Sequence, residues 1–289
     1  MKNLEEQTKQ ILKESHLYAN KKLGQNFLIN EQIVENIIEH AKVNDSDCII
    51  EIGPGIGTLT EALLKKAGRV VCIEIDSNMI PILEKKFLRN PKFELINKDI
   101  LKVDLKELID NQKEMHGFTT IKVVANLPYY ITTPILMKLL EEKLQIESIT
   151  VMVQKEVAQR LAAIPGDEHT GAITHTIYYY TEPSIIMHVP KENFVPIPKV
   201  DSAVLQLKIL KKPRIEVEDE KFFFELIKTA FSQKRKTLLN VLNNANLIRK
   251  ENLIEILKEL NLSEKIRGEK ITIEQFAMLA KLLKNHTVK

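Results

Sequence analysis

The feature that most constrains the fold is a run of three alternating glycines between a short apolar stretch and a helical pattern. Residues 48–52 are mostly apolar, Gly53, Gly55 and Gly57 follow, and apolar side chains then recur at helical spacing. This order predicts a strand, a tight turn and a helix. Glycine suits such a turn because a Cβ would hinder both the sharp bend and the close approach of a ligand. Open α/β sheets bind ligands at the carboxyl ends of their strands, where this turn would lie.

Two common phosphate-binding patterns do not fit the turn. The dinucleotide fingerprint needs glycine at position 58 or 60, where the chain has threonine, and no Gly-Lys-Ser/Thr follows. What remains is E-x-G-x-G-x-G with an acid at the end of the next strand, the pattern of methyltransferases that use S-adenosylmethionine (SAM). A glycine turn without a ligand is the alternative explanation.

Composition limits the class of protein. A chain of 289 residues suits one large domain and a small one, and 44% hydrophobic residues can form a core. No apolar run reaches the roughly 18 residues of a membrane span, and the charged first ten residues lack a secretion signal. Two cysteines in predicted strands and seven scattered histidines predict neither a disulfide framework nor a metal site. We therefore expect a cytoplasmic protein without metal.

Strand and helix patterns alternate through the first 210 residues, which predicts a doubly wound, Rossmann-like α/β domain whose mixed sheet has seven strands. Strands are expected at 48–52, 69–75, 93–97, 121–125 and 148–153, and further β-rich segments at 172–180, 184–189 and 202–210. Helices are expected at 3–15, 31–41, 58–67, 77–88, 133–143 and 155–161. The catalytic domain would be 1–210, with an N-terminal helix and basic loop at 1–28.

After residue 210 the pattern becomes helical only. Helices are expected at 219–231, 234–245, 250–260 and 272–284, which predicts a small all-α domain at 211–289. This segment holds 17 Lys/Arg against 11 Asp/Glu, although the whole chain has a net charge of only +3. A basic C-terminal domain suggests a polyanionic partner.

Acids at the ends of the second and third strands are candidate cofactor ligands. Glu74 lies 17 residues after Gly57, where a carboxylate can accept hydrogen bonds from both hydroxyls of a ribose. Asp99 follows the third strand, where SAM enzymes place an acid that binds the adenine amino group. An alternative for nearby Asp76 is a helix N-cap, and an ordinary loop aspartate is the alternative for Asp99.

The string Asn126-Leu127-Pro128-Tyr129 ends the fourth strand and fits methylation of an exocyclic amine on a planar base. Such a nitrogen is a poor nucleophile because its lone pair is delocalised into the ring. If the Asn126 side-chain oxygen and a backbone carbonyl near Leu127 accept both N–H bonds, the lone pair is free to attack a methyl group. Tyr129 can stack on the base, which is worth roughly 1–3 kcal/mol. A strand exit with a capping asparagine is the alternative.

Phe194 begins a loop with two prolines and could cover the second face of the base, although a core position is equally compatible with the sequence. Cations gather at a strand end and between two predicted C-terminal helices. We expect Lys155, Arg160, Lys234, Arg235 and Lys236 to contact an RNA backbone.

Together these strings resemble one family, the ribosomal RNA adenine dimethyltransferases responsible for kasugamycin sensitivity. Matching segments cover 21–28, 51–60, 126–130, 152–160, 194–204 and 231–238 in the expected order. The resemblance implies SAM-dependent dimethylation of two adjacent adenosines near the 3′ end of small-subunit rRNA in a pre-ribosomal 30S particle. It implies cofactor contacts from Gln25, Asn26, Leu28, Gly53, Gly55, Gly57, Glu74, Ile75, Asp99, Ile100 and Asn126, and RNA contacts that include Lys21 and Lys22.

Three alternatives stay open on sequence alone. The erythromycin-resistance methylases share the chemistry but act on large-subunit rRNA, and the 194–204 and 231–238 segments favour the small subunit. A non-catalytic ribosome-assembly factor would keep the fold. A nicotinamide oxidoreductase is disfavoured because the third fingerprint glycine is missing. We expect the protein to act as a monomer.

Overall fold

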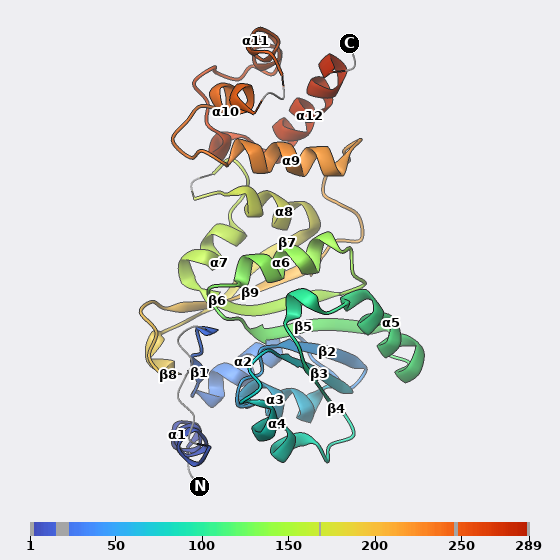
Figure 1. Cartoon of the computed structure of the whole chain (residues 1–289), viewed down its shortest axis with the longest axis vertical. Coiled ribbons are helices and arrows are strands. Elements are labelled where there is room, and N and C mark those ends of the chain that lie inside the picture. Colours follow the sequence, from blue (N-terminus) through green and yellow to red (C-terminus); the bar gives the residue numbers. More distant parts are fainter. Residues whose placement is uncertain (1–2, 16–22, 168, 246–247, 288–289) are drawn as a thin grey trace. The chain divides into compact units, whose positions relative to one another are not determined.

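The structure is a computed structural model that describes residues 3–15, 23–167, 169–245 and 248–287, without side chains for 286 and 287 (Figure 1). Lys21 and Lys22 lie outside the described residues. Contacts divide the chain into two compact units. The first consists of Met1–Ala158 and Ser184–Ile209, and the second of Gln159–Pro183 and Leu210–Lys289. No described helix has the length and apolarity needed to cross a membrane.

A seven-stranded mixed sheet forms the centre of the first unit, as predicted. Its strand order is β4-β3-β2-β5-β6-β9-β7. The five strands from β4 to β6 are parallel, and β9 runs antiparallel to β6. Their bounds are β2 (Asp47–Ile52), β3 (Arg69–Glu74), β4 (Phe93–Asn97), β5 (Thr120–Asn126), β6 (Ser148–Gln154), β7 (Thr181–Val189) and β9 (Ser202–Ile209).

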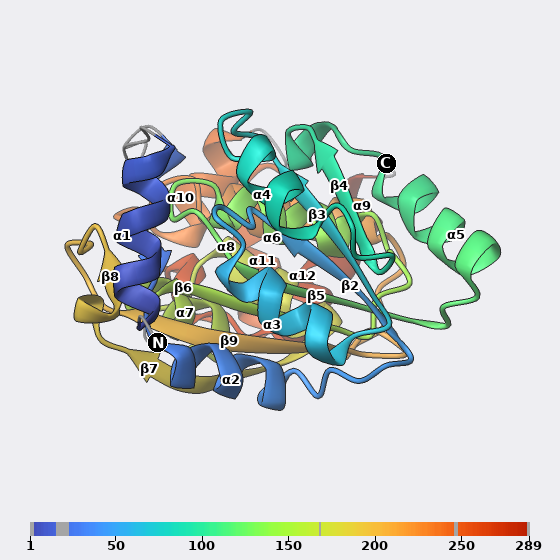
Figure 2. The same ribbon diagram turned by 90° about the horizontal axis from the view of Figure 1, so that it is seen from below.

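Helices on both faces of this sheet confirm the doubly wound, Rossmann-like fold. Figures 1 and 2 show α2, α3 and α4 on one face and α6 on the other. The sequence did not predict α5, which Asp104 caps at its start by accepting a hydrogen bond from the backbone of Glu107. The helices are α1 (Leu4–Glu14), α2 (Glu31–His40), α3 (Thr58–Lys66), α4 (Ile80–Phe87), α5 (Leu105–His116) and α6 (Thr132–Glu141).

The parallel register brings several strand ends to one edge of the sheet. Ile52 pairs with Ile73, Glu74 with Asn97, and Asn126 with Met152. Because the strands are parallel, the polar residues that follow β2, β3 and β5 emerge at the same edge. A pocket that uses side chains far apart in the sequence can therefore form there.

A second, two-stranded sheet was not predicted. β1 (Phe27–Leu28) pairs antiparallel with β8 (Phe194–Val195), so the loop before α2 is joined to the loop before β9. Phe27, Leu28 and Phe194 are all buried in the hydrophobic core of the first unit. Two-residue strands carry no periodic signal, which is why the sequence pattern did not reveal them.

The prediction of β structure at 172–180 was wrong, because α8 (Ala172–Tyr180) forms there and β7 begins only at Thr181. β-Branched and aromatic side chains favour strands only weakly, and tertiary packing overrides that preference. Ile177 and Tyr179 of α8 are buried, and Tyr179 joins the core of the second unit.

The second unit is helical, as predicted, but it also includes residues 159–183, which the sequence analysis assigned to the catalytic domain. Arg214 links the two segments, since its guanidinium donates to the carbonyls of Tyr178 and Thr181 and lies 4.2 Å from the Tyr178 ring centroid. Its remaining helices are α9 (Glu220–Ala230), α10 (Leu238–Asn244), α11 (Lys250–Glu259) and α12 (Ile273–Thr287), and α7 (Lys155–Ala162) crosses the boundary.

Gly57 and Gly117 provide a matched pair that separates backbone strain from overpacking. Both have positive φ, 82° and 73°. A Cβ at Gly57 would lie 2.4 Å from a Phe87 ring carbon, whereas a Cβ at Gly117 would meet nothing within 4 Å. We expect Gly117→Ala to lower the free energy of unfolding by about 1 kcal/mol and Gly57→Ala by about 2–4 kcal/mol, measured by urea denaturation. Equal losses would contradict this assignment.

Candidate active site

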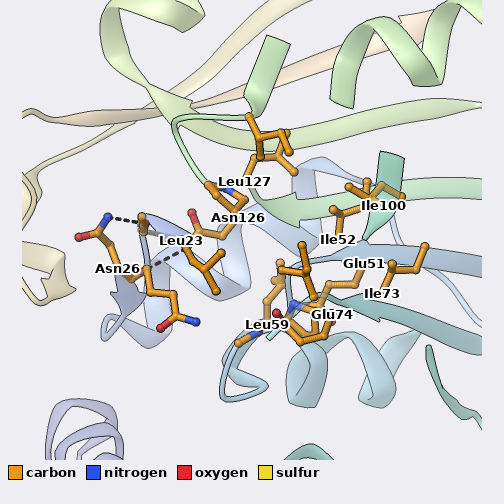
Figure 3. Close-up of a pocket in the computed structure, with 18 of the residues that line it drawn as sticks. Leu23, Asn26, Glu51, Ile52, Leu59, Ile73, Glu74, Ile100, Asn126 and Leu127 are labelled. Atoms are coloured by element: carbon orange, nitrogen blue, oxygen red, sulfur yellow. Dashed lines mark hydrogen bonds between the residues drawn. The ribbon is translucent and has the colours of Figure 1, made fainter. Parts of the chain in front are cut away.

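A pocket opens at the edge where the parallel strands end. It contains about 1060 Å³ including the space open to solvent, and Figure 3 shows side chains from several elements around it. Asn126 and Leu127 lie on one side of it, and Leu59 and Glu74 on the other. The residues that line the pocket and were predicted as cofactor or substrate contacts are Gln25, Asn26, Leu28, Gly53, Gly55, Glu74, Ile75, Asp99, Ile100, Asn126, Leu127, Pro128 and Tyr129.

Gly57 is not one of the described residues that line the pocket. It is the N-cap of α3, and its α-carbon faces the Phe87 ring and Leu83. The third glycine is therefore explained by helix packing. Gly53 and Gly55 remain the glycines beside the pocket.

Glu74 ends β3 and is held by the backbone. Its Oε2 accepts a hydrogen bond from the Gly55 N–H at 3.0 Å, and its Oε1 accepts one from the Asp76 N–H at 2.8 Å. Burial raises the pKa of this carboxyl group, and the two backbone donors oppose that rise. Each carboxylate oxygen keeps a further lone pair for a ligand hydroxyl.

Gln25 and Asp99 extend this polar edge. Gln25 Nε2 donates to Asp76 Oδ2 at 2.7 Å, so the N-terminal loop is tied to the end of β3. Asp76 also accepts from the backbone and side chain of Asn78, which is a turn contact. The N-cap alternative for Asp76 was wrong, because α4 begins at Ile80 and its N-cap is Met79. Asp99 Oδ1 accepts from the Leu101 N–H at 3.0 Å and caps the short helix η2 (Ile100–Lys102). The second oxygen of Asp99 remains an acceptor beside the pocket.

Ile75 and Ile100 are the apolar members of the predicted cofactor set. Ile75 is 46% exposed although it follows a buried strand, and Ile100 is buried. An exposed isoleucine at a pocket wall gives an apolar surface on which a planar ring can lie.

The side-chain amide of Asn126 has a defined orientation. Its Nδ2 donates to the main-chain carbonyl of Asn26 at 3.2 Å. A carbonyl can only accept, so this contact assigns the nitrogen to the Asn26 side and leaves Oδ1 as an acceptor. The side chain of Asn26 turns back to its own loop and donates to the Gly24 carbonyl at 3.0 Å.

The residues after Asn126 are also fixed by hydrogen bonds. Leu127 N–H donates to the Met152 carbonyl at 3.1 Å, and the Pro128 carbonyl accepts from Ile131 N–H and the Thr132 hydroxyl. Within the part of the chain that the structure describes, no hydrogen bond uses the Leu127 carbonyl. A second acceptor therefore remains beside the Asn126 amide.

Tyr129 presents a half-buried ring to the pocket and is anchored by its hydroxyl. That hydroxyl and the Ser202 hydroxyl lie 2.6 Å apart. Burial raises the pKa of Tyr129, so the phenol is neutral near pH 7. Its ring is consequently held by Ser202, which is fully buried at the start of β9.

The predicted role of Phe194 as a second aromatic lid is not supported. Its side chain is 0% exposed, it belongs to the core cluster, and it is not among the described residues that line the pocket. Because β8 pairs with β1, the ring is directed into the core that Phe27 and Leu28 share. The core alternative is the one that the structure adopts.

Glu51 is a buried carboxyl group at the pocket wall. Thr60 donates to its Oε2 at 2.6 Å and the Cys72 thiol donates at 3.4 Å. Burial raises the pKa of Glu51 to about 7, and these two donors limit the rise. Burial also raises the pKa of Cys72 well above its usual value, so the thiol stays protonated.

The predicted RNA-contacting cations differ in exposure. Lys234, Arg235 and Lys236 are all exposed in the loop between α9 and α10. Lys155 and Arg160 of α7 are less exposed, since both are half-buried. The Nε of Arg160 is buried and has no hydrogen-bond partner among the described residues. The loop cations can reach a phosphate backbone without rearrangement.

Several pocket residues were missed by sequence reasoning. They come from the N-terminal loop, the start of α3, the loop after β4, the turn between β5 and α6, and the first turn of α6. Lys98 is exposed, and Tyr130, 55% exposed, contributes a second aromatic ring. For Lys98 and Tyr130, position shortly after a strand end was the available signal. The missed residues include Leu23, Gly24, Thr58, Lys98, Tyr130, Ile131 and Ile135.

The chain is similar to known proteins over nearly its whole length. A family model described as ribosomal RNA adenine dimethylase matches residues 16–285. The chain is 47% identical over 274 residues to the ribosomal RNA small subunit methyltransferase A of Alkaliphilus oremlandii, covering 94% of each chain. It is 47% identical to the protein of that name from Bacillus cytotoxicus, covering 98% and 97%.

Two solved structures are similar over most of their length. A dimethyladenosine transferase from Plasmodium falciparum has a TM-score of 0.72 and 27% identity, covering 90% of this chain and 98% of that one. The 23S rRNA methyltransferase ErmE has a TM-score of 0.67 and 23% identity, covering 90% and 100%. The second likeness concerns the fold alone.

Ionisation of Glu51 makes stability depend on pH. Its pKa is raised from 4.5 to about 7 in the folded protein, so its favourable contribution is complete below about pH 4.5 and is lost as the pH rises through about 7. We expect the parent to lose roughly 2–4 kcal/mol of unfolding free energy relative to Glu51→Gln between pH 5 and pH 8. Chemical denaturation at both pH values measures it, and a constant difference would contradict it.

Proposed function

The chain belongs to the ribosomal RNA adenine dimethylase family, and on that premise we propose that it dimethylates N6 of two adjacent adenosines near the 3′ end of small-subunit rRNA with methyl groups from SAM. The observation that carries the proposal is the pair of acceptors at the end of β5. They are the oriented Oδ1 of Asn126 and the Leu127 carbonyl.

The pocket residues fit the chemical groups of SAM. The Glu74 carboxylate can accept from ribose hydroxyls, and Asp99 with the exposed side chain of Ile75 can hold the adenine. Gly53 and Gly55 let the cofactor approach the backbone. When bound, SAM supplies a methyl group on a positively charged sulfur. We assign Gln25, Asn26, Leu28 and Ile100 to the same binding site.

Activation of the adenine amine is assigned to this chain's own acceptors. If both N6–H bonds are donated in the first transfer, one to Asn126 Oδ1 and one to the Leu127 carbonyl, N6 gains sp³ character and its lone pair, no longer delocalised into the ring, can point at the methyl group. Pro128 fixes the backbone at this point because its ring restricts φ. The Tyr129 ring, anchored by Ser202, provides the surface on which the base stacks.

The transfer needs no general base. With SAM bound, the bond between N6 and the methyl carbon would form as the carbon–sulfur bond broke, and the positive charge would pass from the sulfur to the amine. That amine is strongly acidic and loses its proton to water. Proximity and alignment supply most of the acceleration. The target adenosines must be unpaired or flipped out, since a base inside a helix cannot enter the pocket.

We assign methyl transfer to the first unit and RNA backbone contact to the basic second unit. The exposed Lys234, Arg235 and Lys236 support the second assignment. Lys155 and Arg160 are proposed as further phosphate contacts. We propose that the substrate is a pre-ribosomal 30S particle in the cytoplasm and that the protein acts on it as a monomer.

The small-subunit substrate is preferred over the large-subunit alternative. Relatives that are 45–48% identical over nearly the whole chain carry the small-subunit name, whereas the 23S enzyme matches at 23%. The retained Glu74 and Asn126 also argue against a purely structural assembly factor.

Asn126→Ala tests the amine activation. Loss of the Oδ1 acceptor should slow methyl transfer about 100-fold or more, while RNA affinity changes less than twofold because the phosphate contacts remain. Incorporation of labelled methyl groups into undermethylated small subunits measures the rate, and a filter-binding assay measures affinity. Asn36→Ala, on α2 outside the pocket, is the control and should keep the parental rate. A fully active Asn126→Ala would refute the role of the amide.

Lys234→Ala/Arg235→Ala tests the RNA surface. Removing two phosphate contacts should weaken RNA binding and reduce the slope of log K against log salt by about 1 to 2. Lys221→Ala/Lys258→Ala removes the same charge from exposed positions on α9 and α11 and serves as the control. The same loss of slope in both double variants would mean that only net charge matters.

A further inference from the structure

The two-stranded ribbon of β1 and β8 joins the loop before α2, which lines the pocket, to the loop before β9. Phe27 pairs with Val195, and Leu28 pairs with Phe194. Asn26 comes immediately before β1 and Asn193 immediately before β8, while Asn30 follows β1 by two residues. Asparagines therefore flank both strands of the ribbon.

Asn30 and Asn193 close the end of the ribbon through their side-chain amides. Asn30 Nδ2 donates to Asn193 Oδ1 at 2.8 Å, and Ile29 N–H donates to the Asn193 carbonyl at 2.9 Å. Asn193 Nδ2 donates to the Pro190 carbonyl at 2.9 Å. Asn30 Oδ1 accepts from the Ile33 N–H at 3.3 Å as the N-cap of α2. The side-chain nitrogen and oxygen of both Asn30 and Asn193 therefore have hydrogen-bond partners.

The ribbon has a rigid attachment on its other side. Phe27, Leu28 and Phe194 are buried in the core, and Ile11 and Leu12 of α1 pack against the same cluster. A close-packed core moves little, so the backbone of β1 is fixed on this side. The Asn30–Asn193 contact then limits the remaining movement of β1 relative to β8.

The position of β1 decides where the Asn26 carbonyl lies. That carbonyl accepts the hydrogen bond from Asn126 Nδ2 at 3.2 Å, near the long end of the normal range. A displacement of about 1 Å would break it, and misplacement of this size can cost large factors in rate. Without this partner the Asn126 amide could rotate and present its nitrogen to the substrate.

We propose that Asn30 and Asn193 are positioning residues for methyl transfer, acting through β1 and the Asn26 carbonyl to hold the Asn126 amide with its oxygen toward the target amine. This inference rests on the proposed role of Asn126. The amide pair touches neither reacting group and lies outside the described pocket lining. Its loss should therefore affect the chemical step more than the binding of either substrate.

Two single variants and their combination test the pair. Asn193→Ala removes the acceptor, and Asn30→Ser removes the donor but keeps a residue that can cap α2. We expect each to lower the single-turnover rate of methyl transfer to undermethylated small subunits roughly tenfold. The dissociation constants for SAM and for RNA should stay within twofold, and the melting temperature should fall by no more than a few degrees, the cost of one or two hydrogen bonds. The double variant should be no slower than Asn193→Ala, because Asn193→Ala already removes the Asn30–Asn193 contact that Asn30→Ser breaks.

Asp104→Ser is the matched control, since it exchanges the N-cap of α5 in the same unit without touching the ribbon. It should keep the parental rate. Parental rates in both asparagine variants, multiplicative losses in the double variant, or losses matched by weaker SAM binding and a lower melting temperature would each overturn the inference. Asn126→Ala, assayed in parallel, distinguishes failure of the proposed function from failure of the positioning role. A fully active Asn126→Ala would refute the proposed function. A slow Asn126→Ala with parental rates in the Asn30 and Asn193 variants would refute only the positioning role.

Discussion

The hydrogen bond from Asn126 Nδ2 to the Asn26 carbonyl is the interaction on which the account of the site depends. It connects the end of a central strand to a loop 100 residues earlier in the chain, and it determines which atom of the amide faces the pocket. Amide oxygen and nitrogen have opposite hydrogen-bonding roles, so a rotation of this group would replace an acceptor with a donor. The chemistry therefore depends on backbone placement as much as on residue type.

Parallel strand register provides the rest of the site. Glu74 and Asn126 end β3 and β5, and both lie at the edge where Gly53 follows β2. Their positions after apolar runs made them predictable from sequence, because a parallel sheet brings such residues together. Strand-end geometry accounts for the acids and the asparagine of the pocket, whereas Gln25, Asn26 and Leu28 were predicted only from the family resemblance.

Other features depend on contacts that local sequence does not encode. The β1–β8 ribbon pairs residues more than 160 positions apart, and its strands are too short to show alternation. Residues 172–180 have the composition of a strand, yet packing in the second unit makes them helical. The sequence could not decide whether Phe194 covers the substrate base or lies in the core, because its position depends on the pairing of β8 with β1. Gly57 matched a ligand-binding pattern, whereas its place against Phe87 is a matter of helix packing.

The central claim is that this pocket brings a sulfonium methyl donor and an extruded adenine together. The most direct measurement is incubation of the purified full chain with labelled SAM and undermethylated small ribosomal subunits, followed by digestion of the RNA to nucleosides. The account predicts label in N6,N6-dimethyladenosine from two adjacent positions near the 3′ end of the small-subunit RNA. Label on another nucleoside, or only on added large subunits, would contradict it.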